Sequence, residues 1–311
     1  MTAGGSPGPQ RRATPLPGPD GPPTSRPGPD GPATSRPGPD GPATARATCV
    51  LAPNPSPMTL EGTNTWVLAE PGGSAAIVVD PGPADEGHLR RVTGLATAGD
   101  RRIALVLLTH GHSDHSAGAR MLAEMTGAPV RAADPAHRLG ADGLAPGDAI
   151  TVAGCEVNVI GTPGHSADSV SFLLPADGAL LTGDTVLGRG TTVIAPDGGD
   201  LADYLRTLGE LRRMADPGPA APAGPVTKLL PGHGPVLDDP AGTLDYYIAH
   251  RRERLAEVEA ALAAGDRTAA EIVARVYTGV DPAVLAFAEF SVRAQLAYLD
   301  SRGALPPGVV L

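Results

Sequence analysis

Four side chains that can bind metal ions lie within six residues, directly after an apolar run. The segment Leu105–Gly118 reads LVLLTHGHSDHSAG, and its apolar start has the pattern of a buried strand that turns over into a loop. His110 and His112 stand two residues apart in an extended turn and can share one cation, whereas Asp114 and His115 point to an adjacent position. The sequence therefore predicts a site for two metal ions. Imidazole and carboxylate ligands favour zinc, with iron or manganese as substitutes.

Three further potential ligands also follow apolar strands in turn-rich sequence. His165 ends the segment VNVIGTPGH, Asp184 ends ALLTGD, and His233 ends VTKLLPGH. A carboxylate that arrives alone between two sites is suited to bridging them, because each of its oxygens can bind one metal. We therefore assign the bridging position to Asp184.

The order of these segments resembles the metallo-β-lactamase superfamily. The resemblance covers roughly residues 50–245 and rests on five segments in the expected order: VVDPG, THGHSDH, TPGH, LTGDT and PGHGP. It implies an α/β fold, a four-layer αββα metallo-β-lactamase sandwich, and a role for Asp80 in orienting the histidine loop. Carried over residue by residue, it implies a first metal bound by His110, His112 and His165, a second bound by Asp114, His115 and His233, and Asp184 as the bridge.

Further segments resemble the branch of this superfamily that contains β-lactamase-like protein 2. They are MTLEGTNTWVL at 58–68, GDTVLG at 183–188 and YIAHRRER at 247–254. The best-known members of this branch are similar to endoribonucleases that act on single strands, and a fungal branch contains thioesterases that release polyketides from carrier proteins. The resemblance therefore implies a metal-dependent hydrolase and leaves its substrate open.

The predicted chemistry is hydrolysis at a dinuclear zinc centre by a metal-bridging hydroxide. Two adjacent zinc ions lower the pKa of a shared water towards about 7, so no protein nucleophile is needed. Asp114 is assigned the catalytic role of orienting this hydroxide, since a ligating carboxylate can also accept its proton. Thr191, Thr192 and Tyr204 follow Asp184 and are candidates to line a substrate groove, although helix packing explains Tyr204 equally well.

The substrate class stays open between single-stranded RNA and small esters. A single-strand endoribonuclease is indicated by the resemblance and by a basic helix with Arg251, Arg252 and Arg254. Against it stand a net charge of −10 and an aromatic content of 3%, because tracking a nucleic-acid backbone needs positive charge and base stacking needs rings. The alternative is a small-molecule ester or thioester hydrolase, such as a thioesterase or an enzyme like hydroxyacylglutathione hydrolase. A third reading, a non-catalytic metal-stabilised binding module, is opposed by the complete ligand set.

Three regions of different composition divide the chain. Residues 1–46 hold a Pro/Gly-rich repeat, RPGPDGPATS, without large apolar residues, which predicts a disordered tail. Residues 47–243 form the predicted metallo-β-lactamase domain. In residues 244–311 apolar positions recur at helical spacing, and the resemblance implies a small helical, winged-helix-like appendage. We expect helices from Leu244 to Leu262, from Ala269 to Tyr277 behind a capping box of Thr268 and Glu271, and from Pro282 behind a cap at Asp281.

The remaining histidines and the two cysteines stand in no motif. His88, His137 and His250 are predicted to be surface residues. Cys49 and Cys155 lie outside any ligand pattern, which fits a reducing compartment. The chain opens with no secretory signal and has no apolar run of about 18 residues, so we expect a cytoplasmic protein without a membrane partner. The oligomeric state is not indicated.

Overall fold

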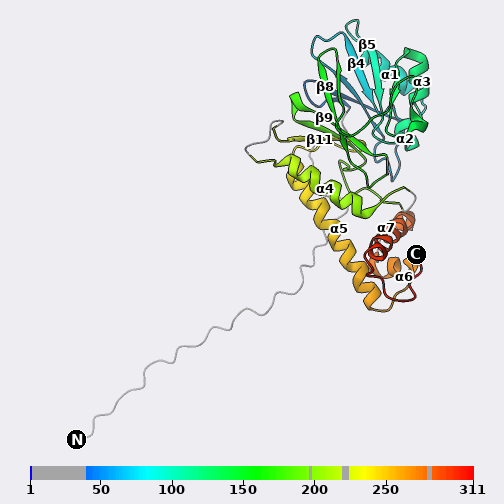
Figure 1. Ribbon diagram of the computed structural model, residues 1–311, viewed down its shortest axis with the longest axis vertical. Helices are drawn as coiled ribbons and strands as arrows, with labels where there is room; N and C mark the ends of the chain where they lie inside the picture. Colours follow the sequence, from blue (N-terminus) through cyan, green and yellow to red (C-terminus); the bar gives the residue numbers. More distant parts are fainter. Residues whose placement is uncertain (2–39, 196–197, 219–223, 279–281) are drawn as a thin grey trace.

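Two β-sheets packed face to face form the centre of the computed structural model (Figure 1). The structure describes Met1 and residues 40–195, 198–218, 224–278 and 282–311. The first sheet has the order β1-β2-β3-β4-β5-β6, with strands Gly41–Pro42, Ala47–Leu51, Asn64–Ala69, Ala75–Val79, Arg102–Leu107 and Val130–Arg131. The second has the order β11-β10-β9-β8-β7, and in chain order its strands β7 to β11 are Ala149–Val152, Cys155–Gly161, Val170–Leu174, Ala179–Gly183 and Lys228–Pro231.

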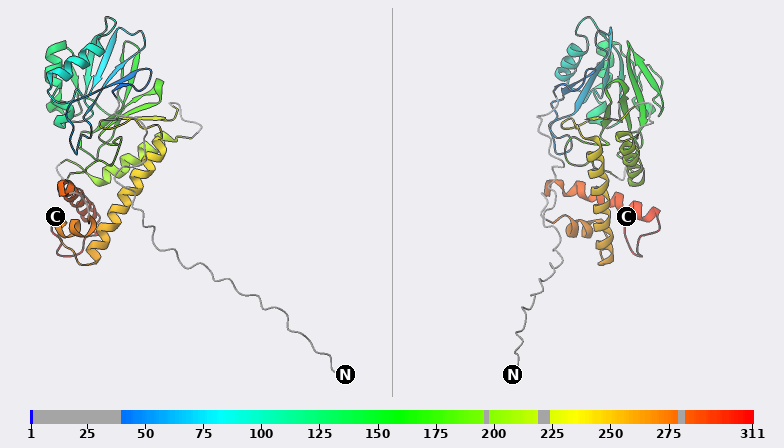
Figure 2. Two further views of the ribbon diagram at one scale, coloured as in Figure 1. Left: turned by 180° about the vertical axis from the view of Figure 1, so that it is seen from behind. Right: turned by 90° about the vertical axis from the view of Figure 1, so that its left-hand side faces the viewer.

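Helices cover the outer side of each sheet, so the central strands are buried on both faces (Figure 2). In β4, Ile77 and Val79 lie between the sheets, whereas Ala76 and Val78 pack under α1 (Glu86–Ala96) and α3 (Ala119–Thr126). On the other side, α4 (Leu201–Ala215) packs against outward-facing residues of the second sheet. This is the predicted four-layer αββα sandwich. Burial on both faces explains why its strands are continuous apolar runs.

The strand ends that carry the candidate ligands meet at one edge of the sandwich. Strands β4 and β5 run parallel, as do β10 and β11, so the loops that follow each pair emerge side by side. The short helix α2 (Ser113–Ser116) lies within the loop after β5. A bridge between Thr63 and His233 joins the start of β3 to the loop after β11, which ties the two sheets together at this edge.

Three helices follow the sandwich: α5 (Pro240–Ala263), α6 (Ala269–Val276) and α7 (Pro282–Ser301). Helix α5 begins earlier than predicted, because the Asp239 side chain caps it by accepting from the Gly242 N–H and Pro240 fits the first turn. The capping box predicted before α6 is confirmed. The cap predicted at Asp281 lies outside the described residues. No helix in the described ranges is long and apolar enough to cross a membrane.

Helix α5 belongs to two packing units. Its first half packs with α4 against the second sheet through Leu244 and Tyr247, and its second half packs with α6 and α7 through Val258 and Leu262 (Figures 1 and 2). The domain border predicted at residue 244 therefore falls inside one continuous helix. The winged-helix-like character of the appendage stays a prediction.

The predicted N-terminal tail is too long at its C-terminal end. Residues Gly41–Pro42 form β1 and pair antiparallel with β2. Arg46 donates to Glu70 and to Asp177, each at 2.6 Å. The assignment of residues 41–46 to a separate tail is therefore wrong, since pairing across the sheet edge leaves no trace in composition. The repeat in residues 2–39 lies outside the described residues.

Candidate metal centre

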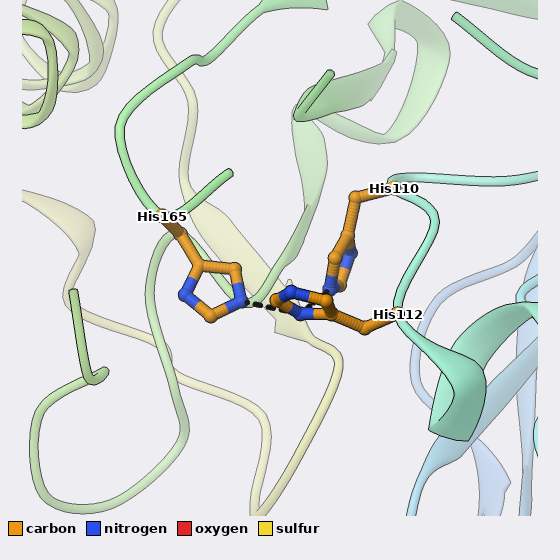
Figure 3. A group of neighbouring side chains, drawn as sticks. All are labelled: His110, His112 and His165. Carbon is orange, nitrogen blue, oxygen red and sulfur yellow. Dashed lines mark hydrogen bonds between the residues drawn. The ribbon is translucent and has the colours of Figure 1, made fainter. Parts of the chain in front are cut away.

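Three histidines from two loops converge at the edge of the sandwich (Figure 3). Nδ1 of His112 lies 2.9 Å from Nε2 of His110 and 3.0 Å from Nε2 of His165. His110 and His165 are buried, whereas His112 is exposed and forms the open side of the group. The structure thus brings together the three residues predicted for the first metal.

A second group of four potential ligands adjoins the first. Nε2 of His233 lies 3.1 Å from Oδ2 of Asp114 and 3.3 Å from Oδ2 of Asp184. Nε2 of His115 lies 3.2 Å from Nε2 of His233 and 3.3 Å from Oδ1 of Asp184. Asp184 also reaches towards the first group, with Oδ2 3.8 Å from Nε2 of His165. A carboxylate that bridges two ions needs this position between the groups.

Hydrogen bonds on the outer side of four rings determine which nitrogen faces the centre. Because carbonyl and carboxylate oxygens only accept, an Nδ1 that contacts one must carry a proton, which leaves Nε2 as the ligand nitrogen. Three Nδ1 contacts are of this kind: His115 to Asp80 Oδ2 at 2.9 Å, His165 to Val193 O at 2.9 Å and His233 to Gly62 O at 3.1 Å. The fourth, His110 to Thr109 Oγ1 at 3.0 Å, has the same direction because the Thr109 hydroxyl donates to Asp80.

This donor set fits divalent metal ions. Ring lone pairs and carboxylate oxygens at such short distances repel one another unless a proton or a cation lies between them. Oδ1 of Asp184 is buried and has no hydrogen-bond partner among the described residues, which is costly for a carboxylate oxygen. Nitrogen and oxygen ligands together suit zinc, iron or manganese. Each group could therefore hold one metal ion.

The buried carboxylate of Asp80 orients both groups. Its Oδ1 accepts from the Thr109 N–H at 2.8 Å, and its Oδ2 accepts from the Thr109 hydroxyl at 2.7 Å and from His115 Nδ1 at 2.9 Å. Since the Thr109 hydroxyl donates to Asp80, its lone pair accepts from His110 Nδ1. Asp80 itself has φ +50°, a left-handed conformation that the surrounding structure must hold. The orienting role that the resemblance implied for Asp80 is thus visible in its hydrogen bonds.

The histidines of the second group balance the charge of its carboxylates. Burial alone would raise the pKa of Asp184, but His233 and His115 outweigh it and hold the pKa well below its ordinary value. Burial lowers the pKa of His233, but Asp184 and Asp114 outweigh burial and raise this pKa to about 9. In the first group, burial lowers the pKa of His110 and His165. The metal-free second group therefore keeps protons at neutral pH, and a metal that binds there must release them.

Two glycines leave the space that the centre requires. A Cβ atom on Gly232 would lie 2.6 Å from Asp184 Oδ1 and 2.7 Å from His115 Cε1. A Cβ atom on Gly183, where φ is +49°, would lie 2.6 Å from Thr109 Oγ1. Any side chain at these two positions would displace a candidate ligand or the hydroxyl that supports one.

The prediction that His88 lies on the surface is wrong. The residue is 1% exposed, and its Nε2 lies 2.9 Å from Thr65 Oγ1, whose hydroxyl donates to the Asp80 carbonyl. Burial lowers the pKa of His88 to about 4. Leu89, Val92 and Ala96 are buried on the same helix, so helical periodicity in α1 was a signal that the sequence offered.

Two polar side chains beside the histidine loop had no motif to indicate them. A Cβ atom on Gly111 would lie 2.5 Å from His137 Nε2 and 3.3 Å from Asp168 Oδ2. His137 and Asp168 are each partly exposed and flank the loop that carries His110 and His112. His250 is also partly exposed, on α5.

The predicted basic face of α5 is not formed. Arg251 is 5% exposed, donates to the Thr192 carbonyl and lies over the Tyr204 ring, 5.1 Å from its centroid. Arg254 pairs with Glu257 at 2.8 Å, and Arg252 is exposed. Tyr204 is fully buried, so helix packing accounts for it.

Comparison with known proteins agrees with this geometry. Residues 58–233 match the metallo-beta-lactamase superfamily. A β-lactamase-like protein 2 homolog of Drosophila melanogaster is 34% identical over 220 residues, which span 66% of this chain and 70% of that protein. The homolog of Caenorhabditis elegans is 31% identical over 221 residues, or 68% and 69% of the two chains. The atrochrysone carboxyl ACP thioesterase of Aspergillus fumigatus is 33% identical over 224 residues, or 70% and 65%.

Two solved structures share the fold. A β-lactamase domain protein from Burkholderia ambifaria superposes with a TM-score of 0.70 at 23% identity, covering 90% of this chain and 95% of that one. A metallo-β-lactamase family protein from Thermus thermophilus superposes with a TM-score of 0.66 at 22% identity, covering 83% and 94%. The chain therefore belongs to the metallo-β-lactamase superfamily, is a metal-dependent hydrolase, and is similar to the β-lactamase-like protein 2 branch.

Proposed function

We propose that this protein hydrolyses small-molecule esters or thioesters with two zinc ions at the site described above. The observation that carries the proposal is the convergence of seven nitrogen and oxygen donors in two adjoining groups, with Asp184 between them. When bound, such ions supply Lewis acidity that activates water and stabilises developing negative charge.

Some side chains of the site would bind the metal ions, and one of them would also accept a proton. We assign the first ion to His110, His112 and His165, and the second to Asp114, His115 and His233, with Asp184 shared. The Asp114 side chain is 29% exposed against 11% for Asp184, so Asp114 is the carboxylate that an entering water meets. Asp114 can therefore orient the attacking water and accept its proton.

No cysteine competes for the role of nucleophile. Cys49 and Cys155 are both free and buried. Burial raises the pKa of the Cys155 thiol to about 11 and that of Cys49 well above its ordinary value. Since only the thiolate is nucleophilic, neither side chain can form a covalent intermediate at neutral pH. The proposal therefore uses no cysteine nucleophile and assigns the attack to water.

Three features favour an acyl substrate over single-stranded RNA. The chain carries a net charge of −10. Of the three arginines that the RNA hypothesis uses, Arg251 is buried and Arg254 pairs with Glu257, which leaves Arg252 exposed. One relative of comparable identity is named as a thioesterase that acts on a carrier protein. RNA cleavage, indicated by resemblance to the β-lactamase-like protein 2 branch, is the competing function.

Metal analysis tests the two-ion site. We expect about two zinc ions per chain in the wild type, and loss of at least one ion together with activity in Asp184→Ala. Asp216→Ala is the matched control, because this carboxylate is 73% exposed and lies on the surface. One tightly held ion in the wild type that is unchanged in Asp184→Ala would contradict the dinuclear assignment.

A parallel assay tests the substrate. The zinc-loaded protein is given acyl thioesters of N-acetylcysteamine, single-stranded RNA and a chromogenic lactam. We expect turnover of the thioesters that Asp184→Ala abolishes and Asp216→Ala retains. RNA cleavage without thioester turnover would instead establish the competing function.

A further inference from the structure

The segment from Thr185 to Val193 connects two parts of the metal centre. It begins directly after Asp184 and ends at the carbonyl that accepts from His165. Nδ1 of His165 lies 2.9 Å from Val193 O and 3.1 Å from Thr192 Oγ1. The position of this segment therefore sets the orientation of the His165 ring, and with it the direction of Nε2.

Three buried side chains from α4 and α5 hold this segment at its start, middle and end. The Tyr204 hydroxyl donates to Thr185 O at 2.7 Å. The Tyr247 hydroxyl accepts from the Leu187 N–H at 2.9 Å and lies 3.3 Å from Leu187 O. Arg251 Nη2 donates to the Thr192 carbonyl. The backbone that follows Asp184 and the carbonyl that accepts from His165 are thus fixed by side chains of α4 and α5.

Arg251 is an unusual residue for the interface between α4 and α5. Its guanidinium is buried, and among the described residues no carboxylate lies within ion-pair distance of it. Its Nε is buried without a hydrogen-bond partner in the described part of the chain. A buried cation without a counter-ion is destabilising, and an apolar side chain would fill a helix interface at lower cost. Among the described residues, the contacts that offset this cost are the Tyr204 ring and the Thr192 carbonyl.

We propose that Arg251 is a positioning residue of the metal centre. By holding the Thr192 carbonyl, it fixes Thr192 Oγ1 and Val193 O around Nδ1 of His165, so that Nε2 meets the first ion. Helix α5 is then part of the hydrolase centre as well as the support of the C-terminal appendage. The inference rests on the proposed function only in requiring that the three-histidine group binds a cation.

Cobalt binding tests the proposal without any measurement of turnover. Co²⁺ replaces zinc, its visible absorption reports the coordination geometry, and competition with a chelator separates the affinities of the two sites. We expect Arg251→Met to weaken one site by about 10- to 100-fold and to change the cobalt spectrum. The control variants Arg252→Ala and Arg254→Met, on the same helix, should bind Co²⁺ at both sites with wild-type affinity.

The same substitution in a His165→Ala variant identifies which of the two metal sites is affected. His165→Ala removes a first-site ligand, so adding Arg251→Met to it should cause no further loss at the remaining site. Additive loss in the double variant would mean that Arg251 acts elsewhere and would overturn the proposal. Arg251→Met with two wild-type affinities and a wild-type spectrum would overturn it as well. Wild-type protein that binds no Co²⁺ would instead refute the proposed function.

Arg251→Gln and Arg251→Lys keep the proposal testable if Arg251→Met does not fold. Both retain a donor for the Thr192 carbonyl, one neutral and one charged. We expect both to bind cobalt at the first site within a few fold of the wild type. Loss of first-site binding in both folded variants would overturn the proposal, because a hydrogen bond to the Thr192 carbonyl would then not be what maintains this site.

Discussion

Replacing Asp80 by Asn should weaken metal binding while leaving the fold intact. The Asp80 carboxylate accepts from the Thr109 N–H through Oδ1, and from the Thr109 hydroxyl and His115 Nδ1 through Oδ2. An asparagine amide in either orientation places its NH₂ against one of these donors. The orientation that keeps the amide oxygen on the Thr109 N–H turns the NH₂ towards the Thr109 hydroxyl and His115 Nδ1. His115 must then move its proton to Nε2, which removes it as a ligand. Asparagine tolerates the left-handed φ of +50° at this position, so the backbone change is small.

The size of the effect follows from the hydrogen bonds lost. A buried hydrogen bond to a charged group contributes about 1.5–3 kcal/mol. Losing the one between Asp80 and His115 corresponds to roughly a 10- to 100-fold fall in metal affinity, the range found for residues that orient ligands. We expect the loss mainly at the second site, because His115 belongs to that group.

Chelator competition at pH 7 measures the two affinities. Asp85→Asn is the matched control, since Asp85 caps α1 by accepting from the His88 N–H at 2.7 Å and Asn caps equally well. Wild-type affinity at both sites in Asp80→Asn would refute the argument that this carboxylate fixes the His115 tautomer.

Three further outcomes are expected. Gly232→Ala should lose metal by elemental analysis, because its Cβ would lie 2.6 Å from Asp184 Oδ1; full occupancy would contradict this steric argument. Burial lowers the pKa of His88 to about 4, below the unfolded value of about 6.5, so the unfolded state protonates first and stability falls as the pH drops through this interval. Between pH 7 and pH 5 the free energy of unfolding, measured with urea, should fall by about 2 kcal/mol more in the wild type than in His88→Gln. Equal losses in the two proteins would contradict the lowered pKa of His88. A chain that starts at Ala47 should melt below one that starts at Asp40, because it lacks β1 and the ion pairs of Arg46; equal transitions would argue against a structural role for residues 40–46.

Local patterns in the sequence determined where the candidate ligands lie along the fold. Each ligand segment is a short apolar run that ends in a Gly- or Pro-containing turn, and this pattern favours a buried strand with its polar residue at the end. Since β10 and β11 run parallel, Asp184 and His233 then reach the same edge. The cap of α6 was equally predictable, because the side chains of Thr268 and Glu271 each accept from the other residue's backbone N–H within one turn.

Only the tertiary structure decided which polar side chains support that site. Arg251, Arg252 and Arg254 look alike in sequence, yet Arg251 is buried, because its contact with Thr192 joins segments 59 residues apart. The same holds for His88 beneath the Asp80 turn and for Arg46 against Asp177. Hydrophobic periodicity reports which face of an element is apolar, whereas the partner of a buried charge or hydroxyl depends on which distant segment packs against it.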